Sequence, residues 1–285
     1  MYVITGATGA LNGATVDHLL DRLPSRDIAV VARDIAKADR FAERGVEVRQ
    51  GDYADPASLE SAFEGADQLL LVSSSDPSAD AVALHRTAID AAAAAGVGRI
   101  LYTSHQGAAV DSPFRPAHDH AVTERLLADS GVAWTSLRNG FYAHSINFLV
   151  GPWRKTGVIA VPADGPVSWT AREDAAEAAA IILTSNGAYN GPTTLTASAA
   201  PTFDDIAGIA TGVVGHEVAF VLTPEDEWIA AQVAAGTPEF VARFTLGIYQ
   251  AAREGRFAGV DPLLGELLGR EPRTVRNLLS EPAAG

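Results

Sequence analysis

The chain has 285 residues, of which 47% are hydrophobic and 20% charged, and its formal net charge is −14. This length suggests about two domains, or one large α/β domain with an attached lobe. The acidic balance argues against a nucleic-acid partner and against an anionic membrane surface, because both require clustered Lys and Arg. The absence of cysteine excludes disulfides, thiolate catalysis and cysteine-ligated metals.

No apolar run reaches the length of a transmembrane helix. The first expected strand begins at residue 2, which leaves no room for a signal peptide. We therefore expect a cytoplasmic protein, without membrane insertion, that acts as an enzyme or a sensor.

The first predicted elements are a short strand over Met1–Ile4 and, beyond the loop of residues 5–13, a helix in which Val16, Leu19, Leu20 and Leu23 recur at helical spacing. The loop between them contains Gly6 and Gly9. Gly6 allows a sharp turn, and Gly9 has no side chain to keep a pyrophosphate from the backbone. The start of the helix offers unpaired N–H groups and a positive dipole end. This context favours a dinucleotide site over a plain turn.

The third glycine of the usual G-x-G-x-x-G pattern is replaced by Asn12, and Gly13 comes one place late. The third small residue normally lets the helix approach the strand closely. We expect either that Asn12 pushes the helix outward slightly or that Gly13 compensates for it.

Strand and helix patterns then alternate regularly along the chain. Strands are predicted over 28–32, 46–50, 68–72, 99–103 and 132–137, and helices over 35–43, 55–63, 79–95 and 116–130. Such alternation with short connections predicts an α/β fold with a doubly wound, parallel Rossmann sheet. Ligands of these sheets bind outside the carboxyl ends of the strands, so the loops at those ends hold the candidate site residues.

The pattern is less regular after residue 140. We expect strands over 158–161, 193–196 and 217–222, and helices over 172–184, 202–214 and the rest of the chain. The predicted organisation is therefore a NAD(P)-binding Rossmann domain over 1–150 and a smaller C-terminal α/β lobe over 151–285 that binds the substrate. Residues of about 165–200 are expected to pack back on the first domain.

The charged residues after the second predicted strand indicate whether the coenzyme is NADPH or NADH. Arg33 suits a 2′-phosphate, and Lys37, one helical turn further on, could reach the same anion. Asp34 could instead present its carboxylate to a ribose hydroxyl, and a solvated Arg–Asp surface pair is the plain alternative. NADPH is favoured, and NADH stays possible.

Two further strand ends carry polar candidates. Asp52, beside Tyr53, could accept a hydrogen bond from an adenine amino group, although a turn or helix cap ahead of Pro56 is the alternative. The short side chains of Ser73–Ser75 would let the backbone approach the ribose and nicotinamide, although serine runs are also common in loops.

Several motifs support a family resemblance. They include Ile4-Thr5-Gly6-Ala7-Thr8-Gly9, Ala32-Arg33-Asp34-Ile35-Ala36-Lys37, Gly51-Asp52-Tyr53, Leu137-Arg138-Asn139-Gly140-Phe141-Tyr142 and Thr170-Ala171-Arg172-Glu173-Asp174. The chain resembles the atypical short-chain dehydrogenases of the NmrA-like group, most of all type 2 NAD(P)H:quinone oxidoreductases and triphenylmethane reductases. The resemblance implies NADPH bound at the first loop, Arg33, Ser73–Ser75, Asn139–Tyr142 and Arg172.

With the candidates found from strand ends, the expected cofactor-binding set is Gly6, Ala7, Thr8, Gly9, Ala10, Leu11, Arg33, Lys37, Asp52, Tyr53, Ser73, Ser74, Ser75, Thr103, Ser104, Asn139, Gly140, Phe141 and Arg172.

Ordinary short-chain dehydrogenases carry a Tyr-x-x-x-Lys pair whose phenol protonates an alkoxide. The corresponding positions here are His120 and Glu124, four residues apart on one helix face. The absence of the tyrosine and the lysine argues against a simple alcohol or ketone as the substrate. It is compatible with a quinone, because the oxyanion formed on reduction of a quinone is delocalised. His120 and Tyr142 are the catalytic candidates, His120 as a proton donor, although a histidine that only stacks or caps is the alternative. His118 and His120 point apart on a helix, so no metal site is expected.

The expected substrate-binding residues are His105, Gln106, Tyr142, His144 and Trp153, with Phe141 and Trp153 alternatively serving as lobe core. The predicted function is hydride transfer from NADPH to a quinone or conjugated polycyclic aromatic substrate. The alternatives are a hydroxylase or ketoreductase of aromatic polyketide biosynthesis and a non-catalytic NAD(P)-binding redox sensor. The expected partner is thus a small planar aromatic or quinone, and the protein is expected to be a monomer or homodimer.

Overall fold

The computed structural model describes residues 1–74, 76 and 78–280. Contacts between residues divide the chain into two compact units, and each unit is made of three separate segments of the chain. Unit 1 comprises residues 1–105, 119–138 and 175–193, and unit 2 comprises residues 106–118, 139–174 and 194 onward. These units follow packing and not chain order, so they do not coincide with a division at residue 150. That division, with a substrate lobe after it, stays a prediction about function.

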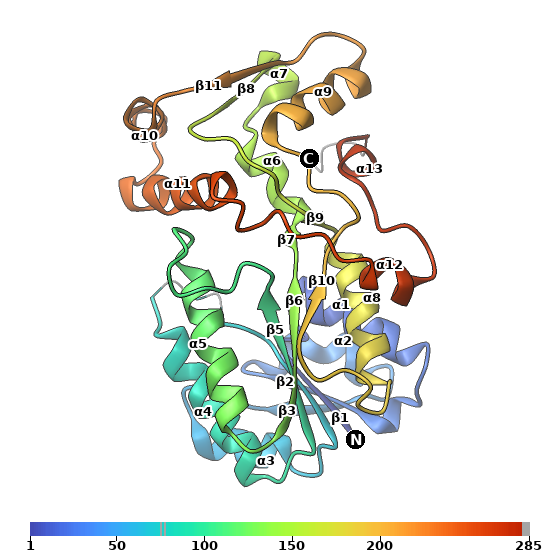
Figure 1. The fold of residues 1–285 in the computed structure, drawn as a ribbon. Coiled ribbons are helices and arrows are strands. Elements are labelled where there is room, and N and C mark those ends of the chain that lie inside the picture. Colours follow the sequence, from blue (N-terminus) through green and yellow to red (C-terminus); the bar gives the residue numbers. More distant parts are fainter. Residues whose placement is uncertain (75, 77, 281–285) are drawn as a thin grey trace. The chain divides into compact units, whose positions relative to one another are not determined.

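Unit 1 is built on the central sheet, whose seven strands have the order β10-β6-β5-β4-β1-β2-β3 (Figure 1). The strands are β1 (Tyr2–Thr5), β2 (Ile28–Ala32), β3 (Glu47–Gln50), β4 (Gln68–Leu71), β5 (Arg99–His105), β6 (Ala133–Asn139) and β10 (Gly191–Leu195). Ile4 is in parallel register with Val30 on one side and Leu70 on the other. The sheet confirms the predicted doubly wound α/β fold.

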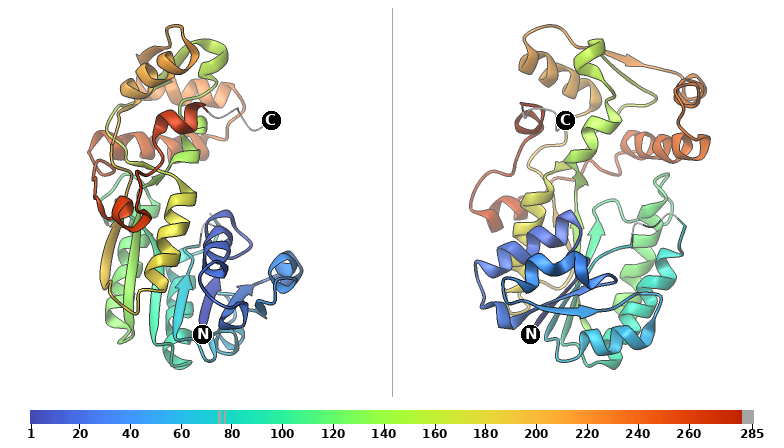
Figure 2. Two further views of the ribbon diagram at one scale, coloured as in Figure 1. Left: turned by 90° about the vertical axis from the view of Figure 1, so that its right-hand side faces the viewer. Right: turned by 180° about the vertical axis from the view of Figure 1, so that it is seen from behind.

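Helices cover both faces of this sheet (Figures 1 and 2). They are α1 (Ala10–Leu20), α2 (Asp39–Ala42), α3 (Pro56–Phe63), α4 (Ala81–Ala94), α5 (Pro116–Asp129) and α8 (Arg172–Leu183). The five residues of β2 are all buried, which is why its sequence is continuously apolar. The inward side chains of α3 and α4 form one hydrophobic cluster with the sheet, including Leu59, Phe63 and Ile89.

The helix predicted over 35–43 is shorter and less regular than expected. It consists of a 3₁₀ turn, η2 (Ile35–Ala38), followed by the single-turn α2. Asp34 caps the 3₁₀ turn through the amide of Ala36, and Gly45 ends the segment with φ at +80°. A second short 3₁₀ turn, η1 (Ser25–Asp27), precedes β2.

Unit 2 contains two short parallel sheets, β11 with β8 and β7 with β9, together with helices. Its strands are β7 (Phe141–Tyr142), β8 (Val158–Val161), β9 (Trp169–Thr170) and β11 (Ala219–Leu222). Its helices are η3 (Ala143–Ser145), α6 (Ile146–Leu149), α7 (Trp153–Thr156), α9 (Phe203–Val214), α10 (Glu225–Ala234), α11 (Glu239–Arg253), α12 (Leu263–Leu268) and α13 (Val275–Ser280). A capping box of Thr202 and Asp205 begins α9.

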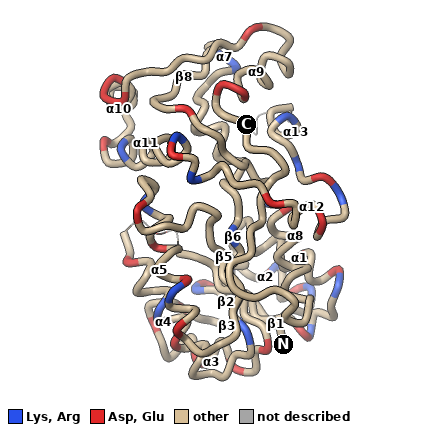
Figure 3. Tube along the Cα trace, in the orientation of Figure 1, with Lys and Arg blue, Asp and Glu red and all other residues tan. Residues whose placement is uncertain are grey.

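None of the helices in the described part is long and apolar enough to cross a membrane. Lys and Arg are scattered along the trace and interspersed with Asp and Glu (Figure 3).

Candidate functional site

The loop between β1 and α1 has the geometry of an anion-binding turn. Gly6 has φ at +64°, and a β-carbon there would lie 2.5 Å from Cγ1 of Val72. The N–H of Gly9, the N-cap residue of α1, donates to the carbonyl oxygen of Gly6 at 2.9 Å. Gly9 offers no side chain to cap the helix, and the first turn contains no acidic residue. The first-turn amides are therefore left for an anion.

Gly13 compensates for the glycine that is missing at position 12, which is one of the two alternatives that the sequence offered. A β-carbon on Gly13 would lie 2.8 Å from the carbonyl oxygen of Ala7, so the close approach of helix to strand occurs at Gly13. Asn12 is buried, and its Nδ2 donates to the carbonyl oxygen of Thr5 at 2.8 Å. Asn12 thus links α1 to β1 instead of forcing them apart.

A pocket of about 450 Å³ lies at the carboxyl ends of β1, β2, β3 and β4 in unit 1. Among the expected cofactor residues, it brings together Gly6, Thr8, Arg33, Asp52, Tyr53, Ser73 and Ser74. Its remaining lining residues are Thr5, Val31, Ala32, Gly51, Val72, Asp76 and Leu84. Four other expected residues, Ala7, Gly9, Ala10 and Leu11, belong to the adjoining loop and the first turn of α1. Lys37, Thr103 and Ser104 do not line this pocket.

Tyr53 forms one wall of the pocket and is anchored at its hydroxyl. Its Oη is hydrogen-bonded to Oγ1 of Thr5 at 2.7 Å and to the carbonyl oxygen of Val72 at 3.0 Å. The same Thr5 oxygen accepts the amide of Val72 at 2.8 Å. Burial raises the pKa of Tyr53 well above its usual range, so the phenol stays neutral. The ring can therefore offer an apolar face to a ligand.

Asp52 is partly committed to the turn before α3. Its Oδ1 accepts the amide of Ala54 at 3.0 Å, and its own amide donates to Oγ of Ser58 at 3.0 Å. This arrangement is the turn that the sequence offered as the alternative. Its other carboxylate oxygen has no hydrogen bond within the described part of the chain and is left for a donor.

The structure separates the roles of Arg33 and its acidic neighbour. Oδ1 of Asp34 accepts the amide of Ala36 at 3.2 Å, which holds this carboxylate at the start of η2. Arg33 lines the pocket and forms no ion pair with any residue that the structure describes. Lys37 lies 3.9 Å from Asp34, and its side chain is 72% exposed. Arg33 therefore lines the pocket, whereas the carboxylate of Asp34 does not.

Ser73 and Ser74 are held in place through their backbone amides. The amide of Ser73 donates to Oγ1 of Thr103 at 2.8 Å, and that of Ser74 donates to Nε2 of His85 at 2.7 Å. Thr103 thus holds the loop that follows β4 through Ser73, whereas Ser75 lies outside the described residues. His85, buried on α4, was missed by the sequence analysis. The only available signal was its helical spacing with the inward-facing Ala88 and Ala92.

Glu124 is the centre of a buried polar cluster in unit 1. Its carboxylate accepts Oγ of Ser104 at 2.8 Å and Oγ of Ser136 at 2.6 Å, and pairs with the guanidinium of Arg138 at 2.5 Å. Burial by itself raises the pKa of Glu124, but hydrogen bonds from Arg138 and the serines outweigh it and hold the pKa below its usual value. Ser104 is therefore bound to Glu124, which orients its hydroxyl toward α5.

His120 lies on α5 beside the end of β5. Its Nδ1 is 2.9 Å from Oη of Tyr102, and its ring stacks on that of His105, with centroids 6.2 Å apart. Burial, with His105 and His85 nearby, lowers the pKa of His120 to about 3. Burial also lowers the pKa of His105 to about 4. Both rings are therefore neutral at physiological pH.

Asn139 and Tyr142 form a polar pair in unit 2. Nδ2 of Asn139 donates to Oη of Tyr142 at 3.0 Å. Burial raises the pKa of Tyr142 to about 12, so its phenol keeps its proton at neutral pH. The residue between β6 and β7 must be glycine, because a β-carbon on Gly140 would lie 2.1 Å from Oγ1 of Thr170.

His144 and Arg172 extend this polar region of unit 2. A guanidinium nitrogen of Arg172 is hydrogen-bonded to Nε2 of His144, and the rings of Tyr142 and His144 are 5.9 Å apart. Burial and the charge of Arg172 lower the pKa of His144. Gln106 donates its amide to the carbonyl oxygen of Asn139 at 2.9 Å and its Nε2 to Phe257 at 3.0 Å. The structure thus brings four of the expected residues together with Asn139.

Phe141 and Trp153 are core residues of unit 2. They are 7% and 3% exposed and belong to the same hydrophobic cluster. The ring of Phe141 packs against those of Phe114, Trp169 and Phe257 at centroid distances of 5.1–5.7 Å. These are the core positions that the sequence offered as the alternative to an aromatic platform.

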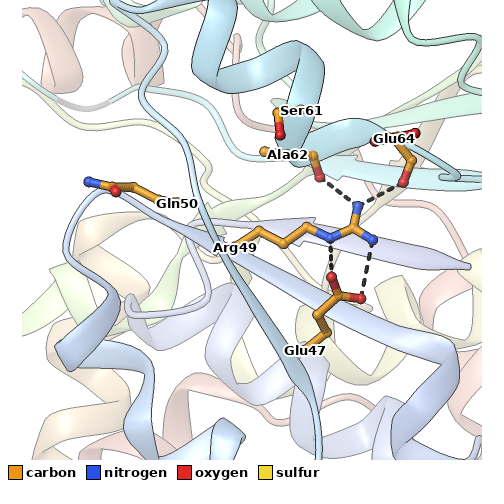
Figure 4. Close-up of a pocket in the computed structure, with 6 residues that line it drawn as sticks. All are labelled: Glu47, Arg49, Gln50, Ser61, Ala62 and Glu64. Carbon is orange, nitrogen blue, oxygen red and sulfur yellow. Dashed lines mark hydrogen bonds and ion pairs between the residues drawn. The ribbon is translucent and has the colours of Figure 1, made fainter.

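A second pocket of about 450 Å³ lies beside the edge strand β3 (Figure 4). Arg49 occupies its centre and pairs with the Glu47 carboxylate at 2.9 Å and 3.2 Å. Its Nη1 donates to the carbonyl oxygens of Ala62 and Glu64 at 2.9 Å and 2.8 Å. The guanidinium of Arg49 therefore caps the carboxyl end of α3. We assign this pocket no ligand, because its central cation is already paired within the protein.

No group of three potential metal ligands occurs among residues 1–74, 76 and 78–280. The polar groups of the first pocket are amides, hydroxyls, a guanidinium and two carboxylates. This donor set suits a nucleotide that carries phosphates.

Comparisons with known proteins identify the family of the chain. A model of the NmrA-like family matches residues 2–260 of the chain. Quinone oxidoreductase 2 of Escherichia coli is 35% identical over 281 residues, which cover 98% of both chains. The NAD(P)H azoreductase of Xenophilus azovorans is 29% identical over 286 residues, which cover 100% of this chain and 98% of that protein.

Solved structures resemble the chain over nearly its whole length. The NADPH-dependent quinone oxidoreductase of Escherichia coli in complex with NADPH has a TM-score of 0.89 and 34% identity, covering 98% of this chain and 99% of that chain. The triphenylmethane reductase of Citrobacter sp. in complex with NADP(H) has the same TM-score, identity and coverage. The similarity therefore includes residues of both units.

Proposed function

This chain belongs to the NmrA-like family, and from that premise we propose how it works as an NAD(P)H-dependent oxidoreductase. It transfers a hydride from NADPH to a quinone or to another conjugated aromatic compound. The names of its relatives, a quinone oxidoreductase, an azoreductase and a triphenylmethane reductase, support an extended π-system as the common feature of the substrates.

The observation that carries this proposal is the pocket at the carboxyl ends of β1–β4, with Gly6 on one side and Arg33 on another. The pyrophosphate fits the uncapped start of α1, where Gly9 leaves the amides accessible. The adenine fits against Tyr53 and the unpaired carboxylate oxygen of Asp52. The loop of Ser73 and Ser74 supports the more distant ribose and the nicotinamide.

The coenzyme is NADPH in preference to NADH. An enzyme that uses NAD usually presents a carboxylate to the ribose 2′-hydroxyl, but Asp34 is occupied as a cap for η2. Arg33 lines the pocket and can form charge-assisted hydrogen bonds with a 2′-phosphate. Lys37, which is largely exposed, adds a second positive charge at this end.

We assign Tyr142 as the proton donor for the reduced oxygen. Its Oη already accepts a hydrogen bond from Asn139, which leaves the single phenolic proton for another acceptor. Its pKa of about 12 keeps the phenol protonated, so that it can donate a hydrogen bond to the oxygen on which negative charge develops. A quinone oxyanion is delocalised and can also take its proton from water, so Tyr142 accelerates the reaction without being indispensable.

The direct test is turnover of NADPH with a panel of acceptors. Purified protein, NADPH and a benzoquinone, a naphthoquinone, an azo dye or a triphenylmethane dye are mixed, and loss of the reduced nicotinamide absorbance is followed. We expect turnover with at least one quinone and none without an acceptor. Tight NADPH binding without turnover of any acceptor would overturn the proposed substrate class.

A further inference from the structure

The strand β11 lies at an open sheet edge of unit 2. In the part of the chain that the structure describes, it pairs with β8 alone, in parallel register (Figure 1). Its sequence, Ala-Phe-Val-Leu, contains neither a charged residue nor a proline. Val221 and Leu222 are 43% and 57% exposed. The strand therefore presents apolar side chains at a sheet edge, where natural proteins usually avoid them.

The backbone on the outer side of β11 has free donors and acceptors. The amides of Ala219 and Thr223 donate to carbonyl oxygens in or next to β8, at 2.8 Å and 2.9 Å. Phe220 and Leu222 alternate with the residues that face β8, so their N–H and C=O groups point away from it. Neither residue has a backbone hydrogen bond on that side among residues 1–74, 76 and 78–280.

The other edge strands with four or more residues are protected against further pairing. At the two edges of the central sheet, β3 carries Glu47 and Arg49, and β10 carries Pro192, which has no N–H. The outer side of β8 is closed at Val158, whose amide and carbonyl groups are both hydrogen-bonded to Oγ1 of Thr156. β11 has none of these devices, which indicates that its edge serves as an interface.

The free edge of β11 is complementary to itself. In an antiparallel pair, residues whose N–H groups point to the partner strand exchange both hydrogen bonds with the residue opposite. When two copies meet about a two-fold axis through Val221, Phe220 of each copy lies opposite Leu222 of the other. This register satisfies both free amides and both free carbonyl groups of each copy. It also places the two exposed Val221 side chains against each other.

The ends of the strand limit the pairing to this register. On one side, the amide of Val218 already donates to Oγ1 of Thr211 at 2.9 Å. On the other side, Pro224 has no N–H to donate. Phe220 and Leu222 are therefore the residues that a partner strand can bond, and Val221 lies midway between them.

We propose that β11 pairs with β11 of a second copy of this chain, antiparallel about a two-fold axis at Val221. The two short sheets of β8 and β11 then join into one continuous sheet. A two-fold contact closes on itself, so the assembly is a dimer and not a fibre. Each copy has a net charge of −14, so added salt should strengthen the association by screening the repulsion between the copies.

Cysteine cross-linking tests the register, because the chain has no cysteine of its own. In the proposed dimer, Val221 faces its own counterpart with Cα atoms about 4.5 Å apart, which is within the range of a disulfide. Leu222 lies about 8 Å from its counterpart, because a rise of two residues adds to the spacing between the strands. Under mild oxidation, we expect a disulfide-linked dimer for Val221→Cys and a monomer for Leu222→Cys in denaturing electrophoresis. Equal cross-linking of the two variants, or none in Val221→Cys, would overturn the proposal.

Sedimentation velocity from low micromolar to several hundred micromolar protein tests the association itself. We expect an equilibrium between monomer and dimer. Val221→Lys places two ammonium groups together at the axis and should raise the dissociation constant at least about 10-fold. Val110→Lys is the matched control, because Val110 is 49% exposed in unit 2 but lies outside β11.

A second variant keeps the test independent of the charge and of folding defects. Leu222→Pro removes an N–H that points away from β8 and leaves the hydrogen bonds to β8 in place, so it should also weaken the dimer. Circular dichroism and urea unfolding verify that each variant is folded. A monomer at every concentration, assemblies that grow beyond a dimer, or equal weakening by Val221→Lys and Val110→Lys would contradict pairing through β11.

Discussion

The backbone amide of Ser74 donates to Nε2 of His85 across 2.7 Å, which joins the loop after β4 to α4. This bond can form only while His85 is neutral, because a protonated ring has no lone pair to accept it. The position of the loop that lines the pocket therefore depends on the charge of a buried histidine.

Stability should decrease at acid pH because of three histidines, His85, His105 and His120, whose pKa values are lowered in the folded protein. Burial lowers the pKa of His85 and His105 to about 4, and that of His120 to about 3, whereas the unfolded pKa is about 6.5. The unfolded state thus binds more protons below pH ~6.5, so the stabilisation is complete above that pH and is lost as the pH falls toward 3–4. Each histidine contributes up to about 1.4 kcal/mol per pH unit within this window.

Urea unfolding between pH 8 and pH 4.5 measures this effect. His85→Gln should make the dependence on pH less steep, and His216→Gln, at an exposed position, should leave it unchanged. A free energy of unfolding that stays constant from pH 7 to pH 5 would contradict the prediction.

Arg33→Ala should change the preference between coenzymes. Loss of charge-assisted hydrogen bonds to a 2′-phosphate corresponds to about 1.5–3 kcal/mol, or roughly a 10- to 100-fold rise in KM for NADPH. The KM for NADH should change by less than about 2-fold, because NADH has no phosphate there. Arg26→Ala, in the turn before β2, is the control for general loss of positive charge. Equal rises in KM for both coenzymes would show that Arg33 does not bind the 2′-phosphate.

Gly6→Ala should destabilise the protein more than Gly96→Ala. Both glycines have positive φ, +64° and +72°, so each substitution costs about 1–2 kcal/mol for the left-handed backbone. Only at Gly6 would the new methyl group also meet Val72 at 2.5 Å, which adds about 1–3 kcal/mol of overpacking. Urea unfolding gives the two free energies, and NADPH titration should show weaker binding for Gly6→Ala alone. Equal destabilisation by the two substitutions would contradict the role of the Val72 contact.

Tyr142→Phe tests proton donation. We expect kcat for a quinone to fall about 10- to 100-fold, at the lower end of general-acid effects because water can substitute. The KM for NADPH should hardly change if Tyr142 acts on the substrate. Since the pKa of Tyr142 is raised to about 12, its loss should remove no step from the pH–rate profile below pH 10. Tyr2→Phe, at the start of β1, serves as the control. An unchanged kcat in Tyr142→Phe would remove the residue from the mechanism.

Arg49→Met should reduce stability without changing activity. The substitution leaves the carbonyl oxygens of Ala62 and Glu64 at the end of α3 without their donor, which costs about 1–3 kcal/mol. The pocket of Figure 4 contains no group assigned to the reaction, so KM and kcat should match those of the unmodified protein. A selective loss of NADPH turnover at unchanged stability would mean that this pocket binds a ligand.

Local patterns in the sequence were sufficient to predict the sheet and to nominate seven of the residues that line the pocket at the ends of β1–β4. The buried run of β2 and the glycines between β1 and α1 determine their conformations through neighbours in the chain, and parallel topology brings the strand ends to one edge. Arg33, Asp52 and Ser73 could therefore be proposed from their places after successive strands.

Contacts between distant residues decided what the patterns left open. The sequence could not tell whether Arg33 or Asp34 faces the pocket, because the answer depends on the Asp34 side chain capping η2. Nor could it predict that Trp153 is buried among residues from several segments of unit 2. His85 meets Ser74 and Thr123 only after α4 and α5 pack on the same sheet. Periodicity determines which face of an element is apolar, whereas hydrogen-bond partners and proton positions depend on which elements the fold places side by side.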